Sequence, residues 1–130
     1  MRTKSYCIQL KPIAWKRAGI NYEQHKVYDQ QTHDKVAFGL YLSQQHGSSV
    51  LFDKPISLDV TFLLPPPKSL SVKNIPLYHK GVPDIDNLVK FLLDACVGVI
   101  MKDDRIVCSL FAKKMYDKRP RTIFTITELL

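Results

Sequence analysis

The sequence predicts an α/β domain of the α+β type, in which a mixed sheet of about four strands carries two packed helices. Two segments, residues 32–45 and 85–97, have the apolar spacing of helices, and four shorter segments alternate as strands do. The elements follow one another in the order β-α-β-α-β-β. A chain of 130 residues without an internal repeat suffices for one core. We therefore expect a single domain over residues 1–130.

The strands are indicated by alternation of apolar and polar residues. The alternation is strictest in residues 56–64 (ISLDVTFLL), which stop at three consecutive prolines that cannot continue a central ladder. Residues 5–11, 105–113 and 121–127 are further strand segments. Because only the short basic turn 114–120 joins the last two segments, we expect them to pair as an antiparallel hairpin.

The first helix is expected to begin with Thr32 as its N-cap and to end near Gln45, where Gly47 is a natural C-terminal stop. Four apolar residues form its expected buried stripe: Val36, Ala37, Leu40 and Tyr41.

The segment before this helix, residues 12–29, has no sustained period and is predicted to be a loop. Basic and aromatic residues alternate in it, which suits contacts with phosphates and stacking on bases. An ordinary solvated loop has a similar composition, and the sequence leaves both readings open.

The stretch from Pro83 to Asp104 organises the rest of the chain. Its helix, residues 85–97, has an unbroken apolar face. Opposite that face, residues at i, i+4 and i+8 form a polar stripe: Asp86, Lys90 and Asp94. Acidic residues gather at both ends of the helix: Asp84, Asp86, Asp103 and Asp104. The sequence therefore concentrates negative charge around one element.

Two explanations account for these acids. Asp84 or Asp86 can cap the helix, since carboxylates accept bonds from the free N–H groups of the first turn and suit the positive end of the helix dipole. One cap needs only one carboxylate, however, and clustered carboxylates repel one another unless a cation lies among them. Hard oxygen ligands favour Mg²⁺ or Mn²⁺. Spacing alone does not decide between capping and a metal site.

The remainder of the chain is basic. The formal net charge is +7, and the isoelectric point is near 9.4. A basic balance favours a polyanionic partner, most often nucleic acid, although it also serves plain solubility. Basic flanks around an acidic centre are the charge layout of a metal-dependent nuclease.

Compartment is indicated by what the sequence lacks. No segment approaches the roughly 18 consecutive apolar residues of a membrane span, and the N-terminal residues have no signal-peptide core. Cys7, Cys96 and Cys108 are an odd, widely spaced set, which we interpret as reduced core residues. We expect a cytoplasmic, nucleoid-associated protein.

Residues 79–107 carry a resemblance to a known family. They read HKGVPDIDNLVKFLLDACVGVIMKDDRIV. This run closely resembles the signature of RusA-type Holliday-junction resolvases (crossover junction endodeoxyribonucleases), small DNA endonucleases often carried by prophages. The family pattern is an Asp-x-Asp-Asn opening of a helix, a Lys one turn later, and an Asp-Asp pair after a Gly-containing break. Before residue 79 the resemblance is weaker and rests on PIAWKRAG and KVYD.

The resemblance implies a homodimer that binds branched DNA and cuts two opposed strands of a four-way junction, in recombination and repair. It implies a Mg²⁺ cofactor, with Mn²⁺ as a possible substitute. By that similarity the metal-binding and catalytic carboxylates are Asp84, Asp86 and Asp104, Asp103 is a supporting metal-binding acid, and Lys90 is the catalytic basic residue. Six basic residues outside core-facing patterns are candidates for contact with the DNA backbone: Lys16, Arg17, Lys73, Lys80, Lys118 and Arg119.

The geometry of this site is left open. A helix over residues 85–97 is about 20 Å long, and the six residues 98–103 span roughly 20 Å when extended. Asp104 can therefore just return to Asp84 within one chain. Alternatively, two such helices lie antiparallel across a dimer axis, and each site is shared. Two other functions also remain: a branched-DNA-binding module without catalysis, and a related nuclease acting on forks, flaps or RNA.

Overall fold

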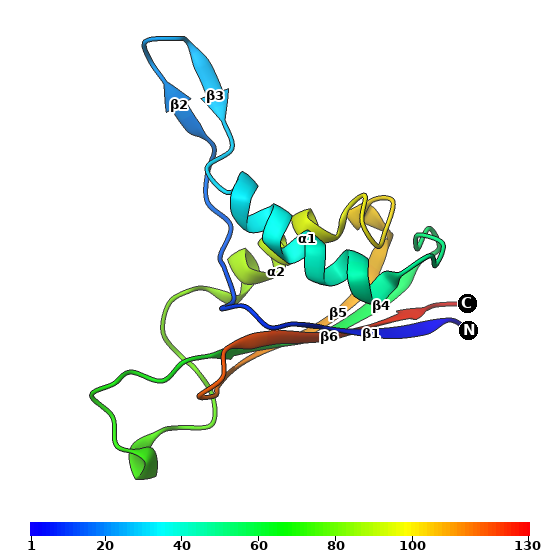
Figure 1. Cartoon of the computed structure of the whole chain (residues 1–130). Coiled ribbons are helices and arrows are strands. Elements are labelled where there is room, and N and C mark those ends of the chain that lie inside the picture. The colour runs from blue at the N-terminus through cyan, green and yellow to red at the C-terminus, as the bar shows by residue number, and fades with distance from the viewer.

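The computed structural model describes residues 1–130 and confirms the predicted α+β class. Both helices lie on one face of a four-stranded mixed sheet, and a small hairpin stands away from it (Figure 1). The elements are β1 (Thr3–Ile8), β2 (Gly19–Asn21), β3 (Lys26–Tyr28), α1 (Thr32–His46), β4 (Ile56–Leu64), α2 (Ile85–Cys96), β5 (Val107–Tyr116) and β6 (Arg121–Glu128). Two short 3₁₀ turns, η1 (Val72–Asn74) and η2 (Asp104–Ile106), precede α2 and β5 respectively. No helix is long and apolar enough to cross a membrane.

The strand order is β1-β6-β4-β5, with β4 parallel to β5 and β6 antiparallel to both β1 and β4. The predicted hairpin of the last two strands is therefore wrong, because β4 lies between them. A β4–α2–β5 crossover places β5 beside β4 in the parallel direction. The following turn then crosses the end of β4, where the Asp117 N–H donates to the Leu64 carbonyl at 2.9 Å. It spans two strand spacings, about 10 Å, which four residues reach easily.

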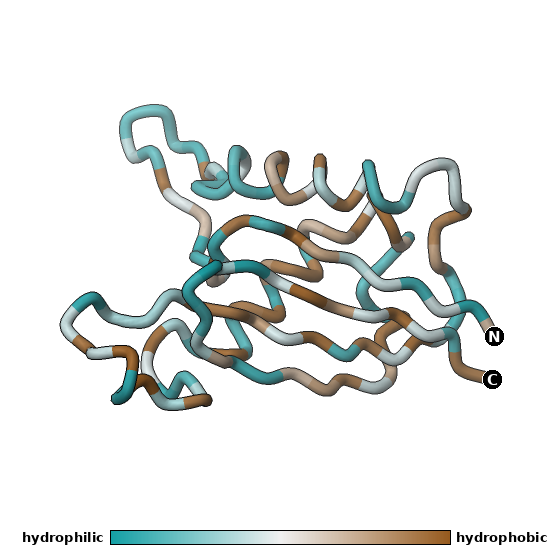
Figure 2. Tube along the Cα trace, turned by 60° about the horizontal axis from the view of Figure 1, so that its bottom comes forward, coloured by the Kyte–Doolittle hydropathy of each residue, from teal (hydrophilic) through white to brown (hydrophobic).

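The core forms between the sheet and α2. Every second residue of β4, from Ile56 to Leu64, is at most 2% exposed. The side chains of Leu88, Phe91 and Leu92 on α2 are equally buried, and each such burial contributes roughly 1.5–3 kcal/mol. Figure 2 shows the sheet from its other side, where hydrophobic and hydrophilic residues alternate along the strands.

Helix α1 has the expected bounds to within one residue, with Gln31 as the N-cap in place of Thr32. The predicted buried stripe is correct only in part, since Ala37 and Tyr41 are half-buried, and Tyr41 packs against the core. The buried residues of α1 are Phe38, Leu42 and His46, whereas Val36 and Leu40 are 59% and 67% exposed. Both sides of this helix are partly apolar, and the larger Phe38 ring takes the inner position because it packs edge-on against Phe91, 5.0 Å between centroids.

The segment predicted to be a loop, residues 12–29, contains the β2–β3 hairpin. Gly19 pairs with Tyr28, and a Cβ at position 19 would lie 2.3 Å from the Tyr28 ring. A larger residue at position 19 would therefore require the exposed Tyr28 ring to move. The hairpin is otherwise open to solvent, since Ile20, Tyr22 and Val27 are 53%, 80% and 71% exposed.

The cysteines differ from the prediction at one position. Cys96 is buried and Cys7 is half-buried, but Cys108 is exposed. Val107 is opposite Ile56 and Ser109 is opposite Ser57, so Cys108 is the extra residue of a β-bulge. A bulge residue leaves the alternation of its strand, which is why the core prediction fails there.

His46 is 3% exposed at the end of α1. Its Nε2 lies 3.1 Å from the Val50 carbonyl, which can only accept, so Nε2 carries the proton and Nδ1 accepts from the Tyr6 hydroxyl at 2.7 Å. Burial is the main cause that lowers the pKa of His46, and the nearby Lys4 and Arg2 cations act in the same direction.

This environment predicts an acid sensitivity of the fold. Below the unfolded-state pKa of about 6.5, the unfolded chain binds a proton that the folded chain resists, so stability falls as pH decreases through this window. The urea midpoint should therefore be lower at about pH 5.5 than at about pH 7.5. His46→Gln should flatten the dependence. A wild-type midpoint that does not change across this window would contradict the prediction.

Candidate active site

Helix α2 presents two of the predicted carboxylates at its N-terminus. Asp84 is the N-cap residue and Asp86 lies in the first turn, and both are exposed. The Asp84 side chain makes no capping hydrogen bond. The Asp86 carboxylate accepts the adjacent Asn87 N–H at 2.9 Å. Capping therefore does not occupy Asp84, and the outer oxygens of both residues face solvent, where they can bind a cation.

Lys114, on β5, holds this end of the helix in place. Its ammonium donates to the carbonyls of Gly81 and Pro83 at 2.6 and 2.7 Å. These bonds fix the segment entering α2 to the C-terminal end of β5. The sequence places Lys114 in a turn, because the expected strand ends at residue 113, three residues before the end of β5. Its position two residues after Ala112 in the alternation was the signal that could have identified it.

The other two carboxylates lie beyond the opposite end of α2. Gly98, with φ of +81°, allows the chain to turn sharply after the helix. The Asp103 carboxylate accepts the Arg105 N–H at 3.0 Å, which lowers the pKa of Asp103. Partial burial raises the pKa of Asp104, and the neighbouring Asp103 and Asp94 carboxylates raise it further.

The two acidic pairs are thus separated by the length of α2. From Asp86 to Cys96 the helix rises about 15 Å. Asp104 precedes β5, which begins beside Ile56, whereas Asp84 lies near the far end of the same strand. Within one chain no group of three His, Cys, Asp or Glu side chains is placed to hold a metal ion. The return of Asp104 to Asp84 within one chain, which the sequence allowed, does not occur in this structure.

Lys90 lies one turn after Asp86 on the polar stripe and is exposed. Its ammonium is 3.7 Å from the centroid of the Trp15 ring. One turn further, Asp94 lies 3.9 Å from the Lys35 ammonium, which also binds Asp29 at 2.7 Å. The stripe is therefore divided, with Asp94 paired to a lysine of α1 and Lys90 resting on an aromatic ring.

The six basic residues predicted to contact DNA are all exposed, and none of their side-chain cations lies within 4.0 Å of a carboxylate. Four belong to the loop after β4 and to the turn after β5: Lys73, Lys80, Lys118 and Arg119. Both segments lie at the left of Figure 1, at the sheet end from which α2 starts. Lys16 and Arg17 follow Trp15, whose backbone N–H donates to the Asn87 carbonyl of α2 at 2.8 Å. These unpaired cations therefore lie in segments at the same end of the sheet as Asp84 and Asp86.

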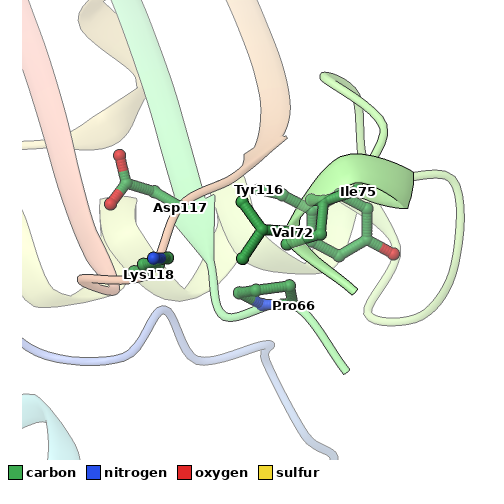
Figure 3. Close-up of a pocket in the computed structure, with 6 residues that line it drawn as sticks. All are labelled: Pro66, Val72, Ile75, Tyr116, Asp117 and Lys118. Atoms are coloured by element: carbon green, nitrogen blue, oxygen red, sulfur yellow. The ribbon is translucent and has the colours of Figure 1, made fainter. Parts of the chain in front are cut away.

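A hollow of about 380 Å³ lies at this end of the sheet, between the loop after β4 and the end of β5 (Figure 3). Its lining is mixed, with apolar, aromatic and charged side chains: Pro66, Val72, Ile75, Tyr116, Asp117 and Lys118. None of the predicted metal-binding carboxylates lines it.

Unpaired basic residues at the same end of a domain as exposed carboxylates are typical of the class of proteins that act on nucleic acid. Comparison with known families agrees. Residues 9–127 match the family described as Endodeoxyribonuclease RusA, and the chain belongs to this family of nucleases. A Bacillus subtilis (strain 168) protein, named Uncharacterized protein YqaN, is 32% identical to this chain over an alignment 130 positions long. The alignment covers 92% of each of the two chains. The resemblance seen in the sequence is thereby confirmed.

The free cations predict salt-dependent binding to DNA. Affinity for DNA falls as salt rises, and each lost phosphate contact should make the plot of log affinity against log salt less steep by roughly 0.9. Replacing both Lys118 and Arg119 by Met should lower the slope on a four-way junction by about 2. Lys54→Met is the matched control, because Lys54 is an exposed lysine at the opposite end of β4. An unchanged slope in the double variant would remove this turn from the DNA contact surface.

Proposed function

We propose that this protein is a metal-dependent endonuclease that resolves four-way DNA junctions by paired nicks in opposed strands. Membership of the RusA family is the observation that carries the proposal. The unpaired cations at the end of the sheet where Asp84 and Asp86 are exposed support it.

The donor set suits Mg²⁺ or Mn²⁺. Asp84 and Asp86 offer carboxylate oxygens without internal ion pairs, and hard oxygen ligands are those that these ions prefer. When bound, the ion would polarise a phosphoryl oxygen and lower the pKa of a water molecule. Lys90, one turn from Asp86, would stabilise charge that develops on the phosphate. Asp104, with Asp103 in support, would complete the ligand set.

A second copy of the chain is needed to bring these ligands together. Two α2 helices lying antiparallel across a two-fold axis would place Asp103 and Asp104 of one protomer beside Asp84 and Asp86 of its partner. Cutting two opposed strands also requires two active sites, which a two-fold dimer supplies.

Strand β5 offers the surface for such a dimer. It is an edge strand, and on its free side only the C-terminal end is covered, by the bridge from Tyr78 to Met115. The remaining edge is free to pair, and Leu110 and Phe111 are 49% and 63% exposed there. Antiparallel pairing centred on Leu110 would place residue 107 of one chain opposite residue 113 of the other. It would bring Asp104, three residues earlier, toward the end of the partner's β5 where Lys114 holds the start of α2.

The carboxylates give the first test. Asp86→Asn should abolish Mg²⁺-dependent cutting of a synthetic four-way junction, because one metal ligand is lost. Binding should be unchanged or tighter, since a negative charge facing phosphate is removed. Asp59→Asn, an exposed aspartate in β4, is the control and should cut normally. Cleavage by Asp86→Asn at the wild-type rate would show that the site is misassigned.

The same assay decides between the proposal and the other two functions. A binding module without catalysis would bind the junction equally with EDTA or Mg²⁺ and never cut it. A nuclease with a different substrate would cut a fork, a flap or RNA faster than the four-way junction.

Mixed dimers test the shared site. Asp86→Asn and Asp104→Asn homodimers should each be inactive. In a mixed dimer with shared sites, one site carries both defects and the other carries neither. Mixing should therefore restore one active site, which nicks one strand of the junction. If each site were formed within one chain, the mixture would stay inactive. Sedimentation as a monomer at concentrations that still support paired nicks would contradict the dimer itself.

A further inference from the structure

The Lys90 ammonium has two kinds of possible partner nearby, carboxylates on its own helix and an aromatic ring. Asp86 and Asp94 lie one turn before and one turn after Lys90, at the spacing that allows ion pairs on a helix. Neither carboxylate is within 4.0 Å of the Lys90 ammonium, and Asp94 instead faces Lys35. The ammonium lies over the face of Trp15, 3.7 Å from the ring centroid, well inside the range of a cation–π interaction.

The backbone that carries the Trp15 ring is held by a set of hydrogen bonds. The backbone N–H of Trp15 donates to the carbonyl of Asn87 at 2.8 Å. The side-chain amide of Gln31 binds both neighbours of Trp15, accepting the Lys16 N–H at 2.9 Å and donating to the Ala14 carbonyl at 2.8 Å. Gln31 is only 3% exposed. Three consecutive residues are therefore fixed to α2 and to the start of α1, and the ring has a defined place above Lys90.

The two kinds of partner have different consequences for the lysine. A carboxylate would neutralise the ammonium and would itself lose its capacity to bind a cation. An aromatic face attracts the ammonium through its quadrupole but carries no net charge, so the positive charge of Lys90 stays unneutralised. N–H donors that point away from the ring stay available to a phosphate oxygen. The ring also restricts a flexible four-carbon side chain that would otherwise sample many rotamers.

We infer that Trp15 is a positioning residue, which holds the Lys90 ammonium on its ring, apart from Asp86 and Asp94, in the orientation from which it meets the scissile phosphate. This inference rests on the proposed nuclease function. In Trp15→Leu the Lys90 ammonium no longer contacts an aromatic ring and is free to pair with Asp86 or Asp94. The cleavage rate of bound junction should therefore fall, while the affinity for the junction is unchanged. Trp15→Phe retains an aromatic face and largely retains the rate.

Trp15 is the one tryptophan of the chain, and its fluorescence therefore reports the contact without any cleavage assay. Lys90→Met removes the charge from the ring and should change the emission spectrum of Trp15. Lys11→Met, at an exposed lysine of the segment before Trp15, is the control and should leave the spectrum unchanged. Identical spectra for Lys90→Met and the wild type would overturn the inference, whatever the protein cleaves.

Single-turnover cleavage of a synthetic four-way junction with Mg²⁺ is the second arm. We expect the rate to fall about 2- to 5-fold in Trp15→Leu, as loss of a cation–π contact of roughly 0.5–1 kcal/mol at an exposed site implies, and less than about 2-fold in Trp15→Phe. Equal losses in both variants, together with equally lowered urea midpoints, would show that Trp15 serves packing alone. A folded Trp15→Leu that cuts at the wild-type rate would also overturn the inference. If Lys90→Met changes the spectrum but the wild type cuts no junction, the contact stands and the proposed function fails.

Discussion

The parallel pairing of β4 with β5 is the constraint on which the rest of the structure depends. Two adjacent parallel strands need a crossover, and α2 supplies it, so the helix must run opposite to both strands. Its first turn then lies at one end of the sheet and its last turn at the other. The acidic residues that flank α2 are therefore held at opposite ends of the sheet, separated by the length of the helix.

Local sequence patterns predicted the helices and strands well where a pattern allowed only one interpretation. Strand β4 was predicted to the residue, because strict alternation leaves a single buried face and Pro65 ends the ladder. Helix α2 was predicted to within one residue for a similar reason. In α1 both sides are partly apolar, and the choice between Val36 and Phe38 depended on Phe91, which belongs to another helix. The pairing of β6 with β4 likewise depended on where the crossover put β5.

The candidate site shows the same division between residue identity and arrangement. The sequence singled out Asp84, Asp86, Asp103, Asp104 and Lys90 because residue type and spacing are local properties. It did not predict the contact of Lys90 with Trp15, since that contact joins segments far apart in the chain and depends on the amide of Gln31 between them. Lys114 was missed because a lysine near the end of a strand resembles a turn residue until its carbonyl partners are known.

The pairing of β1 with β6 has a practical consequence. Thr3 lies opposite Thr127, and both chain ends meet at the side of the sheet away from the basic turn that precedes Arg121 (Figure 1). They also leave from the β1–β6 side of the sheet, whereas β5 is the opposite edge. A fluorophore or surface tether attached at either end would therefore leave the cation-rich loops and the β5 edge unobstructed. Joining the two ends through a short linker is equally compatible with the fold and would allow circular permutants that open the chain at Gly47, in the exposed connection between α1 and β4.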